Sequence, residues 1–185
     1  MDPKGALRQE TAQLVADYLE CCGRRDGPEE RPAPSPAAAT MRLVARELRR
    51  RYRDFFECAR GRLLDQTPEQ VLAEVAELLS QDGFNWGRVA VLVVFAGSLL
   101  ELEDLRKEER AQQLRRERSR RVARELCRYL VDQKGAWLQE HGGWTGFHHH
   151  FTQNQQSDPS STLCCIMAAA AGFGLVGLAL LLAVR

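Results

Sequence analysis

Two polar residues stand close before the most apolar stretch in the interior of the sequence. Val89–Leu100 is twelve residues long without a charge, and Arg88 immediately precedes it. An arginine side chain keeps its charge in any protein environment, so Arg88 needs either a partner or a place at the surface. Asn85, three residues earlier, is a preferred residue for capping the first turn of a helix. Arg88 is therefore the residue here that a purely apolar environment suits least.

Other residue types associated with catalysis or metal binding form no recognisable site. The sequence contains no nucleophile elbow, no HExxH and no P-loop. His148–His150 are consecutive, so on a helix their side chains would point in different directions. The six cysteines, at positions 21, 22, 58, 127, 164 and 165, form no CxxC pair, which argues against a zinc module and a disulfide framework. We therefore predict reduced thiols on the cytosolic side, no enzymatic activity, no metal and no cofactor.

Helical spacing of apolar residues predicts an all-α domain over residues 1–158. Residues 6–22 show this spacing, whereas 23–39 contain four prolines and no periodicity, which predicts a flexible loop. Thr40 is a candidate cap for the next helix, and Thr67–Gln70 has the pattern of a capping box. Val89–Leu100 is too short to span a bilayer and is apolar on all sides, which favours a buried helix wrapped by amphipathic ones.

A long apolar segment lies near the C-terminus. Residues 163–184 contain no charge, and as a helix they would reach about 33 Å, enough to cross a hydrocarbon layer of about 30 Å. We expect a transmembrane tail anchor, inserted after synthesis, which leaves the helical domain facing the cytosol. A hydrophobic helix buried in the soluble core is the competing interpretation.

Charge is balanced overall and concentrated locally. The formal net charge of +1 gives no global attraction to nucleic acid, and we expect no nucleic-acid partner. Residues 115–124 are mostly basic, which is typical of a solvated helix face. Attraction to an anionic membrane or to RNA is the functional alternative, and the apolar tail makes the membrane the better of the two.

Two segments of the sequence resemble motifs of one protein family. Asn85–Arg88, followed by Phe95–Gly97, resembles the first homology motif of the Bcl-2 family of apoptosis regulators. Trp137–Trp144 together with Phe147 resembles the second motif, and the helix at 6–22 is similar to the fourth. The resemblance implies a bundle of helices around a central hydrophobic helical hairpin, with the membrane anchor following it.

The resemblance also implies a partner-binding site. Survival-promoting members of the family bind an amphipathic helix of pro-apoptotic relatives in an apolar groove, the helix-in-groove mode of recognition. By motif position, Arg88 would pair with an aspartate of that helix through two parallel hydrogen bonds, Asn85 would bond the ligand, and Gly87 would leave room for its backbone. The groove itself would be lined by Leu48, Tyr52, Leu72, Val75, Leu79 and Phe95, and supported by Trp137, Gly142, Gly143, Trp144 and Phe147. Each apolar member of this set is equally compatible with plain core packing.

The third motif of the family is degenerate here. Death-promoting members carry a small residue followed by aspartate at that place, whereas this sequence has Ala45 and Arg46. An arginine would repel the arginine of a receiving groove, so we expect a receiver of death-motif helices rather than a ligand. The resemblance thus implies an anti-apoptotic regulator that binds pro-apoptotic relatives and restrains outer mitochondrial membrane permeabilisation, anchored in the outer mitochondrial membrane, the endoplasmic reticulum or the nuclear envelope. A pro-apoptotic pore-forming effector of the same fold is the alternative.

Overall fold

The computed structural model describes residues 3–22, 31–53, 56, 67–80, 83–100 and 109–153, and within these ranges it contains helices and no strands. The elements are α1 (Pro3–Cys22), α2 (Pro36–Arg51), α4 (Pro68–Leu78), α5 (Trp86–Ser98), α6 (Glu109–Arg128), the π-helical segment η2 (Tyr129–Gln133), α7 (Gly135–Glu140) and α8 (Gly143–Gln153). The predicted all-α fold is confirmed.

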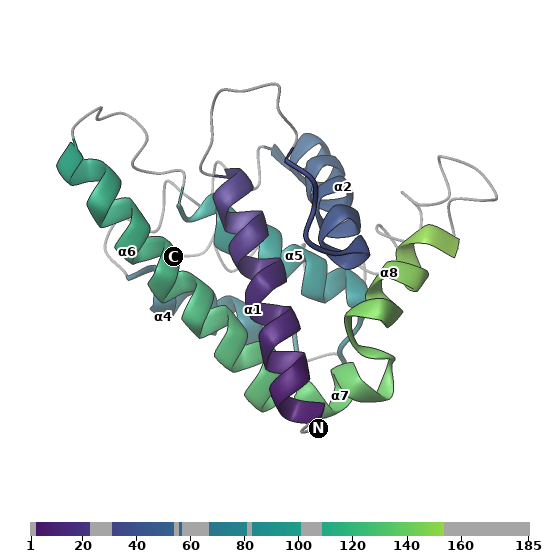
Figure 1. Cartoon of the computed structure of the whole chain (residues 1–185). Coiled ribbons are helices and arrows are strands. Elements are labelled where there is room, and N and C mark those ends of the chain that lie inside the picture. The colour runs from purple at the N-terminus through teal and green to yellow at the C-terminus, as the bar shows by residue number, and fades with distance from the viewer. Residues whose placement is uncertain are drawn as a thin grey trace.

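Helix α5 is the centre of the bundle. Every residue from Trp86 to Ser98 is buried. Helices α1, α2, α4 and α6 all contact it, and α1 crosses in front of it in Figure 1. A helix that is apolar around its whole circumference is stable in water only when other helices cover it on several sides. The prediction of a buried helix rather than a buried strand at Val89–Leu100 is therefore confirmed.

The surrounding helices are amphipathic and turn one face toward α5. In α2 the buried face includes Met41 and Leu48, and in α4 it includes Val71 and Val75. Helix α4 begins at the predicted capping box: the Thr67 side chain accepts from the Gln70 backbone, and the Gln70 side chain accepts from the Thr67 backbone at 3.1 Å. The residues of α4 that pack against α5 are thereby fixed in register from the first turn.

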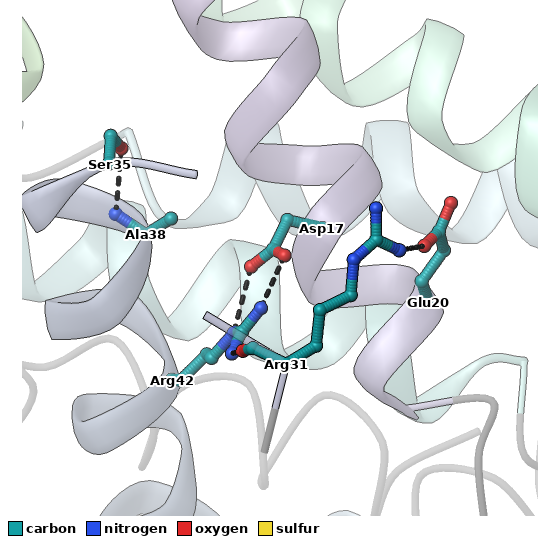
Figure 2. Close-up of polar contacts among 6 residues, drawn as sticks. All are labelled: Asp17, Glu20, Arg31, Ser35, Ala38 and Arg42. Carbon is teal, nitrogen blue, oxygen red and sulfur yellow. Dashed lines mark hydrogen bonds and ion pairs between the residues drawn. The ribbon is translucent and has the colours of Figure 1, made fainter. Parts of the chain in front are cut away.

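The predicted loop at 23–39 is too long at its C-terminal end. Helix α2 begins at Pro36, where Ser35 is the N-cap and its hydroxyl accepts from the Ala38 amide at 3.2 Å (Figure 2). Thr40, predicted as the cap, lies inside the helix and is buried. Alanine is the best helix former but is too small to produce an apolar stripe, so the segment before Thr40 lacks periodicity although it is helical. Residues 23–30 lie outside the described part of the chain.

The expected central hydrophobic hairpin is also only half apolar. Helix α6 follows α5 in sequence but lies along one edge of the bundle (Figure 1). Its buried face contains Val122 and Leu126, while Arg120 and Arg124 on the opposite side are exposed. An edge helix keeps one face in water, so its charges have no desolvation cost to offset.

One turn of π-helix, η2, continues α6 and was not predicted. The Lys134 amide donates to the Tyr129 carbonyl at 3.2 Å, five residues back, instead of four. The wider turn leaves Tyr129 and Leu130 buried, and the Tyr129 hydroxyl donates to the Ala76 carbonyl of α4 at 2.9 Å. The distortion thus joins the end of α6 to α4.

The predicted tail anchor at 163–184 falls within residues 154–185, which lie outside the described part of the chain. No helix of the described ranges combines the length and the apolarity that crossing a bilayer requires.

Candidate functional site

The first turn of α5 is organised by Asn85. Its side-chain oxygen accepts from the Arg88 amide at 2.9 Å, as expected of an N-cap in extended conformation. Trp86 and Gly87 follow in the same turn and are buried. The predicted capping role of Asn85 is confirmed, and it orders the backbone of the turn that carries Arg88.

Arg88 is buried, with only 5% of its surface exposed. Its Nη1 donates to the Leu79 carbonyl at 3.1 Å and also to the Gly83 carbonyl. Leu79 is the C-cap of α4, and a helix leaves its last carbonyls without partners inside the helix. The guanidinium donates a hydrogen bond to this carbonyl. The expectation that Arg88 needs a partner is met by these backbone carbonyls, which tie the end of α4 to the start of α5.

The residues predicted to line a groove all belong to the hydrophobic core or pack directly against it. Leu48, Leu72, Val75, Leu79 and Phe95 are at most 3% exposed, and Tyr52 is partly buried against the same cluster. In this conformation they therefore have the core role that was the alternative interpretation. Most of the segment that joins α2 to α4, residues 57–66, lies outside the described part of the chain.

The two homology motifs meet at Trp86. Its ring lies 4.9 Å, centroid to centroid, from Trp137 of α7 and 5.6 Å from Phe147 of α8, both close to edge-to-face. Trp144 lies 6.3 Å away on the same side. The predicted supporting residues thus pack against the turn that carries Arg88, and each such ring pair contributes about 0.5–1.5 kcal/mol beyond its buried area.

A sharp turn between α7 and α8 makes this aromatic cluster possible. Gly142 and Gly143 have φ values of +80° and +59°, a region that side-chain-bearing residues rarely adopt. The turn reverses the chain so that Trp137 and Trp144 both reach Trp86. These two glycines therefore separate α7 from α8.

Two polar contacts between distant helices were not predicted. The Trp144 indole donates to the Thr11 hydroxyl at 2.8 Å, and Thr11 in turn donates to the Leu7 carbonyl at 2.7 Å. The Thr40 hydroxyl lies 2.8 Å from Nδ1 of His148. Threonines inside apolar helix faces indicate that a buried hydroxyl needs some partner, but not which distant residue supplies it.

A bidentate ion pair joins α1 to α2. Nε and Nη2 of Arg42 lie 2.9 and 2.5 Å from the two oxygens of Asp17, and Nη1 donates to the Arg31 carbonyl at 2.6 Å (Figure 2). The side chains of Arg42 and Asp17 are 18% and 12% exposed. Arg31 also pairs with Glu20 at 3.3 Å, so the segment before α2 is held against α1.

A cavity of about 390 Å³ lies between α4, α5, α6 and η2. Its lining includes the apolar Leu72 and Leu126 and the charged Glu77 and Lys134. The Lys134 ammonium lies over the rings of Phe84 and Tyr129, 5.2 and 5.7 Å from their centroids. No sequence signal pointed to this cavity, because it depends on how four separate elements pack.

The fold and these motifs define a helical regulator that works by binding other proteins, and the comparisons identify its family. The family model for apoptosis regulator proteins of the Bcl-2 family matches residues 41–144. The chain therefore belongs to the Bcl-2 family.

Individual relatives place it more closely. It is 42% identical to the anti-apoptotic protein NR13 of Coturnix japonica, over 98% of this chain and 99% of that protein. It is 40% identical to Bcl-2-like protein 10 of Homo sapiens, over 78% of this chain and 76% of that one. The crystal structure of the zebrafish pro-survival protein NRZ in complex with Bad BH3 is similar with a TM-score of 0.63 and 31% identity, over 80% of this chain and 96% of that one.

These relatives confirm three predictions. The resemblance to the Bcl-2 family is confirmed, and the relatives with about 40% identity include NR13 and Bcl-2-like protein 10. The chain is a regulator rather than an enzyme, because the family consists of apoptosis regulators. Relatives named anti-apoptotic and pro-survival agree with the anti-apoptotic interpretation in preference to the pore-forming alternative.

Proposed function

We propose that this chain promotes survival by binding the BH3 helices of pro-apoptotic relatives beside the first turn of α5. The observation that carries the proposal is the packing of the second homology motif against Trp86, which fixes the turn containing Asn85 and Arg88. NRZ, a pro-survival relative, binds the Bad BH3 helix. A fixed turn that carries a guanidinium is suited to holding one acidic side chain in one position.

The geometry of Arg88 suggests how a ligand is taken up. Its Nη1 is bonded to the neutral carbonyls of Leu79 and Gly83, and a carboxylate is a stronger acceptor for a guanidinium than a carbonyl. An aspartate of the incoming helix would therefore bind Arg88 in exchange for, or in addition to, these bonds. The apolar residues of the BH3 helix would insert between α2 and α4, which requires those helices to separate because Leu48 and Val75 are buried in the free protein.

The third motif supports a receiving role for the chain. Ala45 is buried together with Met41, Val44 and Leu48 of α2, and Arg46, where death-promoting relatives have aspartate, is exposed. A helix with arginine at that position would bring two like charges together in a receiving groove. The expected direction of binding is therefore one-way.

Calorimetric titration of the full chain with a Bad BH3 peptide tests the site. Arg88→Ala should weaken binding by roughly 2–5 kcal/mol if the charge pair forms in a desolvated position. The matched control is Arg124→Ala, which removes an exposed arginine from α6 and should leave the affinity unchanged. Thermal unfolding of both variants measures the structural contribution of Arg88 separately.

A double-mutant cycle distinguishes direct pairing from an indirect effect. The second change replaces the peptide's aspartate by alanine. If Arg88 binds that aspartate, the two losses will not add, because either change alone removes the same interaction. Additive losses would mean that Arg88 acts by holding the α4–α5 junction, and the proposed contact would be wrong.

The biological consequence is tested on isolated mitochondria. Wild-type chain should reduce cytochrome c release that is triggered by pro-apoptotic relatives, and Arg88→Ala should not. Release caused by this chain alone would instead identify a pore-forming effector.

We further propose that residues 163–184 anchor the chain in the outer mitochondrial membrane, the endoplasmic reticulum or the nuclear envelope. The support is the length of this uncharged stretch, about 33 Å as a helix. The wild-type chain should stay in the membrane fraction after alkaline extraction. The variant that lacks these residues should appear in the soluble fraction. A deletion variant that stays in the membrane fraction would contradict the anchor.

A further inference from the structure

Helix α6 carries a row of three exposed arginines. Arg116, Arg120 and Arg124 are spaced four residues apart, so they follow one another along the same side of the helix over about 12 Å. The opposite side of α6, with Val122 and Leu126, is buried against the bundle. The row therefore points away from the core, at the edge of the molecule where α6 lies in Figure 1.

This arginine row differs from other arginines of the same helix. Arg121 pairs with Glu69 of α4 at 3.3 Å, and Arg128 pairs with Glu125. By contrast, no carboxylate within the described ranges lies in ion-pair distance of Arg116, Arg120 or Arg124. Between residues 113 and 128, Glu117 is the acidic residue on the exposed side of α6, so this part of the helix keeps a net positive charge.

Like charges four residues apart on a helix repel one another. The isolated domain therefore gains nothing from the row, and a negative surface outside the domain would relieve the repulsion. Three charges within about 12 Å in a line also fit a planar partner, because all of them can approach a plane together.

The neighbouring residues favour a membrane over nucleic acid as that partner. Proteins that bind single-stranded nucleic acid combine cations with aromatic side chains on which bases stack, and residues 113–128 contain no aromatic residue. The row therefore lacks the stacking groups that nucleic acid needs, whereas an anionic lipid surface needs only the positive charges.

We infer that the row Arg116, Arg120 and Arg124 docks α6 on an anionic lipid surface. The inference rests on the proposed tail anchor, which would bring the domain to a membrane. Docking through α6 would place that edge of the bundle on the lipid, with α8 on the far side of the bundle in Figure 1.

The test measures how much of the full chain binds to lipid vesicles. The chain is made by cell-free synthesis, and flotation separates vesicle-bound from unbound protein. Vesicles consist of phosphatidylcholine alone or with roughly one-fifth phosphatidylserine. The anchor should bind both, and the row should add the preference for anionic vesicles. At roughly fivefold for each arginine near the surface, we expect a preference of about 100-fold, which declines as added salt screens the charges.

The decisive variant replaces Arg116, Arg120 and Arg124 by glutamine, and the control replaces Arg50, Arg51 and Arg53 of the α2 end by glutamine. Both remove the same charge, and both sets are exposed. Loss of the anionic preference in the row variant, with its retention in the control, supports the inference. Equal loss in both variants, or no loss in the row variant, overturns it.

Two further readouts separate the possible failures. If neither the wild type nor the variants bind neutral vesicles, the proposed tail anchor is wrong. The role of the row is then judged by comparing the binding of wild type and row variant to anionic vesicles. If poly(uridine) binds the wild type more tightly than anionic vesicles do and displaces it from them, nucleic acid is the partner and the membrane inference falls. Thermal unfolding checks that the row variant is folded, and relief of repulsion should leave its midpoint at or above that of the wild type.

Discussion

The ion pair between α1 and α2 gives the sharpest prediction about what holds α2 in place. Asp17→Asn removes the charge that Arg42 contacts through two hydrogen bonds of 2.9 and 2.5 Å. Fully exposed pairs contribute about 0.2–1 kcal/mol, and breaking a fully buried pair costs about 3–5 kcal/mol. Side chains that are 18% and 12% exposed lie between these limits, so we expect a loss of about 2 kcal/mol. For a chain of this size the unfolding midpoint should fall by roughly 4–8 °C.

Urea unfolding of Asp17→Asn, Arg42→Met and the double variant measures the pair itself. The coupling energy of this cycle should be about 1–2 kcal/mol, because each single change leaves the same interaction broken. Arg50→Met is the matched control, since Arg50 forms an exposed pair with Glu47 within the same helix. A coupling energy below about 0.5 kcal/mol would refute the reasoning that burial strengthens the Asp17–Arg42 pair.

Three further predictions concern thiol reactivity, pH and packing. Burial raises the pKa of Cys127 to about 11, so at pH 8 iodoacetamide should modify it roughly 100-fold more slowly than the exposed Cys21, which peptide mass spectrometry would measure. Burial lowers the pKa of His150, so the folded state resists protonation; stability is fully present above the unfolded value near 6.5 and is lost as the pH falls below it. Urea unfolding at about pH 7.5 and 5.5 should therefore show a larger acid-induced loss in wild type than in His150→Gln. Gly97→Ala should destabilise by about 1–3 kcal/mol, because the added carbon would lie 2.8 Å from Cε1 of the buried Tyr18; an unfolding midpoint above wild type, from the higher helix propensity of alanine, would contradict this.

Local signals in the sequence predicted the parts of the fold that local interactions decide. The capping box at Thr67 and Gln70 involves residues three apart, and the helix starts where it predicts. The cap at Asn85 is equally local, since its side chain bonds an amide only three residues further along the chain. The burial of Val89–Leu100 follows from composition alone, because no exposed environment suits such a stretch.

Contacts that depend on distant packing could not be predicted. The direction of the Arg88 side chain is set by where α4 ends and how Gly83, with its φ of +101°, returns the chain. The hydrogen bond between Thr40 and His148 joins residues that are 108 positions apart, and neither residue type indicates which residue it will bond. The early start of α2 was missed for a different reason, because alanine helices have no apolar stripe to detect.

The bond between Thr11 and Trp144 also bears on how the protein is made. It spans 133 positions, and α1 packs against α6, α7 and α8, which are all synthesised much later. During translation α5 therefore leaves the ribosome after α1, α2 and α4 but before α6 exists to cover its remaining side. A nascent chain with part of an apolar helix uncovered is prone to aggregation, and chaperones bind such surfaces. Closure of the bundle is thus a late event, completed only when the second homology motif has been synthesised.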